Sequence, residues 1–367
     1  MKLRMFSAGC AGMLAQPILL AGNVTAQEPP RVLFVRGAER SGGFFEGQND
    51  FALTEQLADI GNQSTSGGNH GWFELAELLR GAGFIVEQAI EPLEPGAPST
   101  GQTNGAPLPF DQVPLRRYRV IVLGSNNAVY QSEQIDAVED YVWAGGGLLL
   151  ISDANFGSDW PDAANSDQQF LDRFGWTMQQ DQGTYQLRRQ DGDFLIPSHP
   201  VLDGVDVFDG EGVSPIVLPV SDMPGVRSLL VARAKPGRNT RNNDSDTGQG
   251  TSRPVGPRDA ALCVAYAGAG RLAGHIDRNT FFNANGAGTS INRFDNAAYA
   301  VNLITWLAFG EHDRDADLDV DIDDLHEQNQ QAVDVNGDGR IDAQDIDATM
   351  RLVRFSERRG TESSSIP

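Results

Sequence analysis

The stretch YRVIVLGSN at residues 118–126, followed by IDAVEDYVWAGGGLLLISD at residues 135–153, decides the fold. The apolar runs 120–123 and 148–151 have the length and composition of buried parallel strands. Between them, one helical face gathers the apolar side chains of Ile135, Val138, Tyr141 and Val142. A run of three glycines ends that helix. The stretch therefore predicts a strand, a helix and a second strand in succession.

The same alternation continues on both sides, from about residue 31 to residue 310. Further strands are expected at 32–35, 84–86, 228–232, 261–266 and 271–276, and further helices at 72–79 and 297–309. This order predicts an α/β domain with a doubly wound, mostly parallel, flavodoxin-like sheet. Segments 92–114 and 235–259 are rich in Gly, Pro, Ser, Asn and Asp, so we expect surface loops there.

The first 26 residues have the build of a secretory signal. A short basic start precedes an apolar run to about Leu20, and the small residues up to Ala26 offer a cleavage site. The run is too short and too interrupted to span a bilayer. We therefore expect a secreted or periplasmic protein without a transmembrane segment. Because Cys10 would leave with the signal, Cys263 would have no partner for an intramolecular disulfide.

The charge of the chain argues against nucleic acid as a partner, because a formal net charge of −22 repels phosphates. The excess is concentrated near the C-terminus, where residues 311–347 hold 14 acidic and 2 basic side chains. Such a block is either a solvated tail or a cation site. The spacing of the acidic residues distinguishes the two.

Residues 334–345, DVNGDGRIDAQD, fit a twelve-residue calcium loop. Oxygen-bearing side chains occupy positions 1, 3, 5, 9 and 12, glycine occupies position 6, and position 7 supplies its backbone carbonyl. Ile341, at position 8, is expected to pack against its counterpart in a neighbouring loop. The expected Ca²⁺ ligands are Asp334, Asn336, Asp338, Arg340, Asp342 and Asp345.

The pattern recurs 21 positions upstream, with expected ligands at Asp313, Asp315, Asp317, Asp319, Asp321 and Asp324. In this copy Leu318 replaces the glycine at position 6, where a branched side chain is disfavoured if φ is positive. Whether this loop is filled, or binds more weakly, stays open. His312 and His326 flank the two loops and are expected in solvent.

The two loop-plus-helix repeats, with Asp at position 12 and no entering helix, resemble a type I dockerin over about residues 313–356. The resemblance implies a small α-helical calcium-loop module at 311–357, with a flexible tail at 358–367. It also implies a protein partner and a setting among exported bacterial machinery related to polysaccharides. Positions 10 and 11, which help dock a cohesin in cellulosomal dockerins, are Ile322-Asp323 and Ala343-Gln344 here rather than Ser-Thr.

The layout of residues 31–310 resembles the class I glutamine amidotransferase-like superfamily, including its ThuA-like branch. GAGRLAGHIDRNTFF at 268–282 and NAAYAVNLITWLAFG at 296–310 carry the resemblance together with the opening stretch. It implies one α/β domain at 27–310. Amidotransferases of this superfamily place a cysteine on a strand-to-helix turn, but the corresponding segment 152–157 has none. Since Cys263 lies inside an apolar strand, glutamine hydrolysis is not expected.

Polar residues at the carboxyl ends of the strands are the candidate catalytic groups. Asp153, His275 and Asp277 could support acid–base catalysis, and His275-Ile-Asp277 is similar to the amidotransferase His-x-Glu. The alternative is structural, with Asp153 capping a helix, Asp277 pairing with Arg278 or a backbone amide, and His275 a satisfied, half-buried imidazole. No nucleophile–base pair is visible in the sequence.

Together these patterns predict a secreted, calcium-binding modular protein whose α/β domain binds a sugar-like or polymer ligand. The alternative is a secreted hydrolase acting on glycans or related small molecules.

Overall fold

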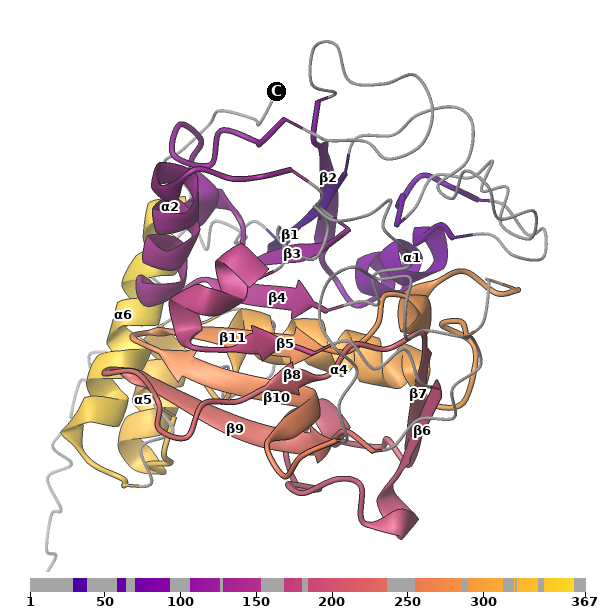
Figure 1. Ribbon diagram of the computed structural model, residues 1–367. Coiled ribbons are helices and arrows are strands. Elements are labelled where there is room, and N and C mark those ends of the chain that lie inside the picture. The colour runs from indigo at the N-terminus through magenta and orange to yellow at the C-terminus, as the bar shows by residue number, and fades with distance from the viewer. Residues whose placement is uncertain are drawn as a thin grey trace, which may run out of the picture.

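The computed structural model describes residues 29–37, 58–63, 70–92, 106–125, 128–152, 168–179, 184–235, 255–285, 289–312, 320, 322–335 and 340–359. Strands and helices alternate along these ranges and form one sheet with helices around it (Figure 1). Within them, no helix combines the length and the apolar character that a membrane span requires.

Five parallel strands form one half of the main sheet, in the order β2-β1-β3-β4-β11. The order 2-1-3-4 is that of flavodoxin-like sheets, so the predicted α/β class is confirmed. All residues of β1 except the first are buried, as expected of a parallel strand covered on both faces. The strands span Arg31–Arg36 (β1), Ile85–Ile90 (β2), Val120–Ser125 (β3), Gly147–Ile151 (β4) and Gly270–His275 (β11).

Beyond β11 the sheet is antiparallel, a strand direction that the apolar runs at 228–232 and 261–266 do not specify. The cause is the two-residue turn 268–269, where Gly268 has φ +64° and joins β10 to β11 as a hairpin. An apolar run predicts a strand but not the direction of its neighbour. The antiparallel strands are β5 (Thr177–Met178), β8 (Ile216–Val217), β9 (Val226–Arg233) and β10 (Asp259–Ala267). A separate hairpin pairs β6 (Thr184–Arg188) with β7 (Val207–Glu211).

Helices cover both faces of the sheet, as a doubly wound fold requires. Side chains of α1 (Phe73–Gly81) and α4 (Asn296–Phe309) share one core cluster with Val120 and Val122 of β3. Those of α2 (Ser132–Trp143) share the other cluster with Ile121 and Leu123. Alternate residues of β3 therefore serve opposite cores. Short 3₁₀ turns span Leu115–Arg117, Asp172–Phe174, Arg189–Asp191, Pro200–Leu202 and Asn279–Phe281.

The predicted glycine run does end α2, and one of its members has a packing role. Gly145 has φ +121°, a conformation that L side chains rarely adopt. At Gly147, a Cβ would lie 2.4 Å from the backbone oxygen of Leu307. The absence of a side chain there is what lets α4 approach the start of β4.

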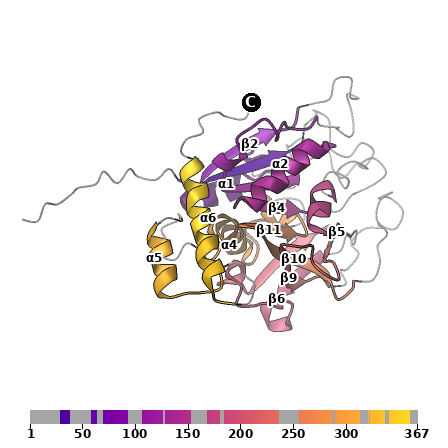
Figure 2. The same cartoon turned by 90° about the vertical axis from the view of Figure 1, so that its left-hand side faces the viewer.

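The C-terminal helices α5 (Ile322–Gln330) and α6 (Ala343–Arg359) stand side by side against the α/β domain (Figures 1 and 2). They lie beside the amino ends of β4 and β11 (Figure 1). Val320 and Leu352 are wholly buried in the same core cluster as α1 and α4. The C-terminal segment is therefore anchored in the core of the α/β domain.

Candidate functional site

The carboxyl edge of the parallel strands is the site predicted from the sequence, and part of it lies in the described residues. Arg36 is the last residue of β1, Ser152 follows β4, and His275 and Asp277 lie at and beyond the end of β11. All four residues are buried. Burial lowers the pKa of Arg36, while the charge of Asp59 raises it. Asp153 lies outside the described residues, so its catalytic role stays a prediction.

His275 is wholly buried and both of its ring nitrogens are hydrogen-bonded. Thr280 Oγ1 donates its proton to the backbone oxygen of Asp209 across 2.8 Å, so it accepts a bond from His275 Nε2 across 3.0 Å. Nδ1 is then the acceptor for the hydroxyl of Tyr299, 2.9 Å away. Burial lowers the pKa of His275 to about 3. The imidazole is therefore neutral and fully used within the protein.

Asp277 is also wholly buried, and both carboxylate oxygens hold the backbone. Oδ2 accepts from the amide of Glu211 across 2.6 Å, and Oδ1 accepts from the amide of Asn279 across 2.9 Å. The side chain thereby joins the end of β7 to the turn after β11. This arrangement agrees with the structural alternative, in which a backbone amide engages Asp277.

Asp209 in β7 organises a buried polar cluster that sequence reasoning missed. Its Oδ1 accepts from the hydroxyl of Thr289 and from Asn296 Nδ2, the latter across 2.9 Å, and Arg293 Nη2 lies 3.2 Å from Oδ2. The backbone oxygen of Asp209 also accepts from Thr280. These partners lie at least 71 residues away along the chain, so no local pattern could have revealed the cluster.

Glu91, just after β2, is a second buried carboxylate at the same edge. It accepts from the amide of Ala128 across 3.0 Å and from the hydroxyl of Tyr130 across 2.7 Å. Burial and this carboxylate raise the pKa of Tyr130. The carboxylates of Glu91 and Asp277, at the described part of this edge, are thus buried and hydrogen-bonded within the protein.

In the C-terminal segment, the structure describes five of the twelve predicted calcium ligands. Asp324 and Asp345, the two residues at position 12, are almost wholly buried although both are acidic. Asp345 Oδ1 accepts from the amide of Val335 across 3.0 Å, and Oδ2 accepts from the amide of Asp342 across 2.8 Å. Asp334, Arg340 and Asp342 are described as well. The remaining predicted ligands, Asp313, Asp315, Asp317, Asp319, Asp321, Asn336 and Asp338, lie outside the described residues.

Among the described residues, no three or more His, Cys, Asp or Glu side chains cluster as a metal site. The sequence also predicts that the residues at position 8 of the two loops, Val320 and Ile341, pack against each other, and the structure differs. Val320 is wholly buried, whereas Ile341 is 61 % exposed. Val320 packs into the core of the α/β domain instead of against Ile341.

His312 is buried, and the expectation that it sits in solvent is wrong. Its Nδ1 lies 3.0 Å from Thr349 Oγ1, whose own proton goes to the backbone oxygen of Asp345. Burial lowers the pKa of His312, and the charges of two nearby arginines lower it further. The contact ties the residue preceding loop one to the helix following loop two. His326 is exposed, as expected.

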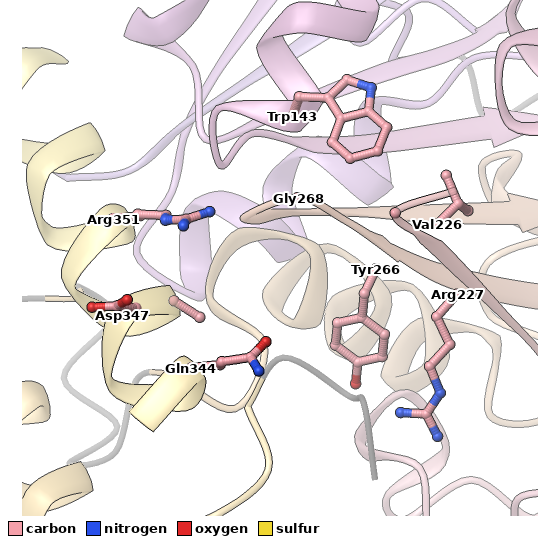
Figure 3. Close-up of a pocket in the computed structure, with 10 residues that line it drawn as sticks. Trp143, Val226, Arg227, Tyr266, Gly268, Gln344, Asp347 and Arg351 are labelled. Atoms are coloured by element: carbon pink, nitrogen blue, oxygen red, sulfur yellow. The ribbon is translucent and has the colours of Figure 1, made fainter. Parts of the chain in front are cut away.

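A pocket of about 360 Å³ lies at the opposite edge of the sheet, between α6 and the turn that joins β10 to β11 (Figure 3). Trp143 at the end of α2, Arg227 of β9 and Tyr266 of β10 line one side of it, while Gln344, Asp347 and Arg351 of α6 line the other. No motif in the sequence pointed to this pocket, because its lining comes from four separate segments.

Neither a protein-family model nor a curated protein matches the chain. Solved structures of similar layout include a ThuA-like protein from Parabacteroides merdae ATCC 43184, with 14 % identity over 77 % of this chain and 91 % of that one and a TM-score of 0.38. A ThuA-like protein from Bacteroides uniformis ATCC 8492 has 16 % identity over 78 % and 94 %, with a TM-score of 0.40. The mmIFT52 N-terminal domain has 11 % identity over 76 % and 98 %, with a TM-score of 0.43.

These identities and scores assign no function and establish no family for the chain. The structural neighbours include ThuA-like proteins, the branch that the sequence resembles. The α/β fold itself is established by the strand order and by the helices on both faces of the sheet.

Proposed function

We propose that this protein binds calcium through its C-terminal loops and that its α/β domain serves ligand binding rather than hydrolysis. The observation that carries the calcium proposal is the position of Asp345. Its carboxylate joins Val335, the second residue of loop two, to Asp342, the ninth. A buried carboxylate therefore links the described ends of loop two in an acidic segment, and a hard divalent cation prefers oxygen ligands of this kind.

In loop two, the side chains of Asp334, Asn336, Asp338, Asp342 and Asp345 and the carbonyl of Arg340 would hold the ion. In loop one, the equivalent set is Asp313, Asp315, Asp317, Asp319, Asp321 and Asp324. Calcium would neutralise the crowded carboxylates and so favour the packed state of α5 and α6. The buried position of Asp324 supports a calcium site in loop one as well.

The geometry of His275 favours a binding role for the α/β domain. A general base must reach its substrate, but both nitrogens of this imidazole bond to protein hydroxyls and the ring is wholly buried. Cys263 is no alternative nucleophile, because it is wholly buried in β10 and burial raises the pKa of its thiol. A glycan hydrolase using Asp153, His275 and Asp277 would have to release two of these side chains from their bonds.

Export, a protein partner of the C-terminal module and a sugar-like or polymer ligand belong to the same proposal. They rest on the signal pattern at 1–26 and on the dockerin and amidotransferase-like resemblances.

Calcium titration calorimetry on the chain from residue 27 onward tests the proposal. The wild type is expected to bind calcium, and the pair Asp334→Asn with Asp338→Asn is expected to lose the site in loop two. A control pair, Asp140→Asn with Glu327→Gln, removes the same charge from exposed positions and should keep wild-type binding. The proposal fails if the wild type produces no binding heat, or if the loop pair binds as well as the control pair.

A further inference from the structure

We infer that the pocket between α6 and the β10–β11 turn binds a sugar that carries a carboxylate, such as a uronic acid. This inference deepens the proposed ligand-binding role, on which it rests for the ligand class. It places that role at the amino edge of the parallel strands, away from the edge where the sequence predicts it. The volume of about 360 Å³ suits a small molecule of one or two rings.

One wall of the pocket is an indole held in a fixed position. Trp143 lies against Gly225 and Gly268, both in left-handed backbone with φ +80° and +64°. A Cβ at either glycine would come within 2.8 Å of the Trp143 side chain. Trp143 Nε1 also donates to Glu139 Oε1 across 3.3 Å. Two glycines and a hydrogen bond thus seat the ring in place.

A second ring, that of Tyr266, is held equally well. Its hydroxyl donates to Glu311 Oε1 across 3.2 Å, and its ring meets Trp306 edge-on with the centroids 5.8 Å apart. Rigid aromatic faces present apolar surface at a small cost in side-chain entropy, and the apolar face of a sugar ring can pack on such a surface. Trp143 and Tyr266 therefore provide the apolar part of the site.

Two guanidinium groups supply the charge. Arg227 pairs with Tyr266 across the β9–β10 ladder, and Arg351 reaches from α6 toward Gly268 (Figure 3). Within the described part of the chain, neither arginine has an ion-pair partner, although the chain has 50 acidic and 28 basic residues. Two guanidinium groups at one pocket favour a carboxylate brought by the ligand, since guanidinium and carboxylate form strong paired hydrogen bonds.

The two remaining polar side chains that line the pocket, Gln344 and Asp347, also come from α6. An amide and a carboxylate accept hydrogen bonds from hydroxyl groups. A ligand with an anionic group alone would leave Asp347 facing like charge. A polyhydroxylated ring with one carboxylate satisfies the arginines, Asp347 and both aromatic rings together.

The experiment is a titration of glucuronate into the chain from residue 27 onward in excess calcium, followed by calorimetry and by the indole N–H signal of Trp143. That signal is assigned with Trp143→Phe. Glucose and inorganic sulfate are titrated in parallel. Glucuronate should bind and shift the signal, whereas glucose and sulfate should bind more weakly.

Arg227→Gln and Arg351→Gln should each weaken glucuronate binding by about tenfold or more, because each removes a charge-assisted hydrogen bond. Arg258→Gln is the control, since this exposed arginine lies at the opposite end of β10. Thermal melting shows whether each variant remains folded, and Arg351 is exposed, so its substitution should not disturb packing.

The inference is overturned if glucuronate does not bind, if glucose or sulfate binds as tightly, or if both arginine variants bind like the control. Calcium binding is measured separately, so a chain that binds calcium but not glucuronate refutes only this inference. A chain that binds glucuronate but not calcium refutes only the calcium proposal.

Discussion

The hydroxyl of Tyr299 in α4 donates a hydrogen bond to Nδ1 of His275 in β11 across 2.9 Å. On the other side of the ring, Nε2 bonds to Thr280, which bonds in turn to the backbone of β7. One neutral imidazole therefore links the last helix of the α/β domain to two strands. Both ring nitrogens of this candidate catalytic residue are therefore engaged by hydroxyl groups of the protein.

Tyr299→Phe should lower the free energy of unfolding by about 1–3 kcal/mol, because it leaves a buried acceptor nitrogen without a donor. Urea unfolding measures the loss. Thr280→Val tests the other side of the same ring. Because both hydroxyls act through one imidazole, the double variant should deviate from additivity by about 0.5 kcal/mol or more. Additive losses would contradict the linkage.

Stability should fall as the pH falls below about 6.5, the ordinary pKa of an exposed histidine. Burial lowers the pKa of His275 to about 3 and that of His199 to about 4, so the unfolded chain takes up protons before the folded chain does. Their stabilising effect is complete above the unfolded pKa and is lost toward the folded pKa. Near pH 5 each histidine should cost about 2 kcal/mol of stability.

His199→Asn should flatten this pH dependence. In the wild type, His199 Nδ1 accepts a hydrogen bond from the amide of Val201 across 3.3 Å. The side-chain oxygen of asparagine can accept the same bond, and an asparagine side chain does not titrate. Urea unfolding between neutral pH and about pH 5 measures the slope. His326→Asn, which removes a histidine at an exposed position, is measured in parallel as the control.

Leu352→Ala should lower the free energy of unfolding by about 2–5 kcal/mol, because Leu352 is wholly buried where α6 enters the core. Hydrogen exchange along α6 should rise in the same variant. Ile341→Ala is the matched control, since Ile341 is 61 % exposed, and should change stability by no more than about 0.5 kcal/mol. Equal losses in the two variants would show that α6 does not hold the segment in place.

Removing calcium should lower the melting temperature of the whole chain, not only of its C-terminal segment. Val320 and Leu352 belong to the same core cluster as α1 and α4, so loosening the loops weakens that core. With free calcium at about 100 times Kd, binding stabilises the folded state by about 2.7 kcal/mol per site. Calorimetric melting with calcium and with a chelator measures the shift, which should shrink in the Asp334→Asn, Asp338→Asn pair. If the chelator does not change the melting temperature of the wild type, calcium binding is not coupled to the stability of the core.

The strands and helices could be predicted largely from the sequence, because burial on both faces leaves a direct mark. The runs 120–123 and 148–151 are apolar throughout and became β3 and β4. The helix predicted from Ile135 onward became α2. The direction of β10 could not be derived from its apolar run, since both parallel and antiparallel neighbours bury the same side chains.

For the candidate sites, too, features that depend on local spacing could be predicted, and features that depend on distant contacts could not. The predicted calcium loops rest on local spacing alone, and the sequence shows the oxygen pattern of such a loop completely at 334–345. The burial of His312 could not be predicted, because the residue that it contacts, Thr349, lies 37 residues later in the chain.

The sequence by itself determined what depends on neighbours along the chain: the alternation of strands and helices, the glycine run that ends α2, and the oxygen spacing of the loops. Only the tertiary structure decided what depends on distant partners. It enclosed His275 between Thr280 and Tyr299, and it brought Arg227 and Arg351 to one pocket. The physical reason is that burial and hydrogen bonding are set by groups that meet in space, and local periodicity carries no record of them.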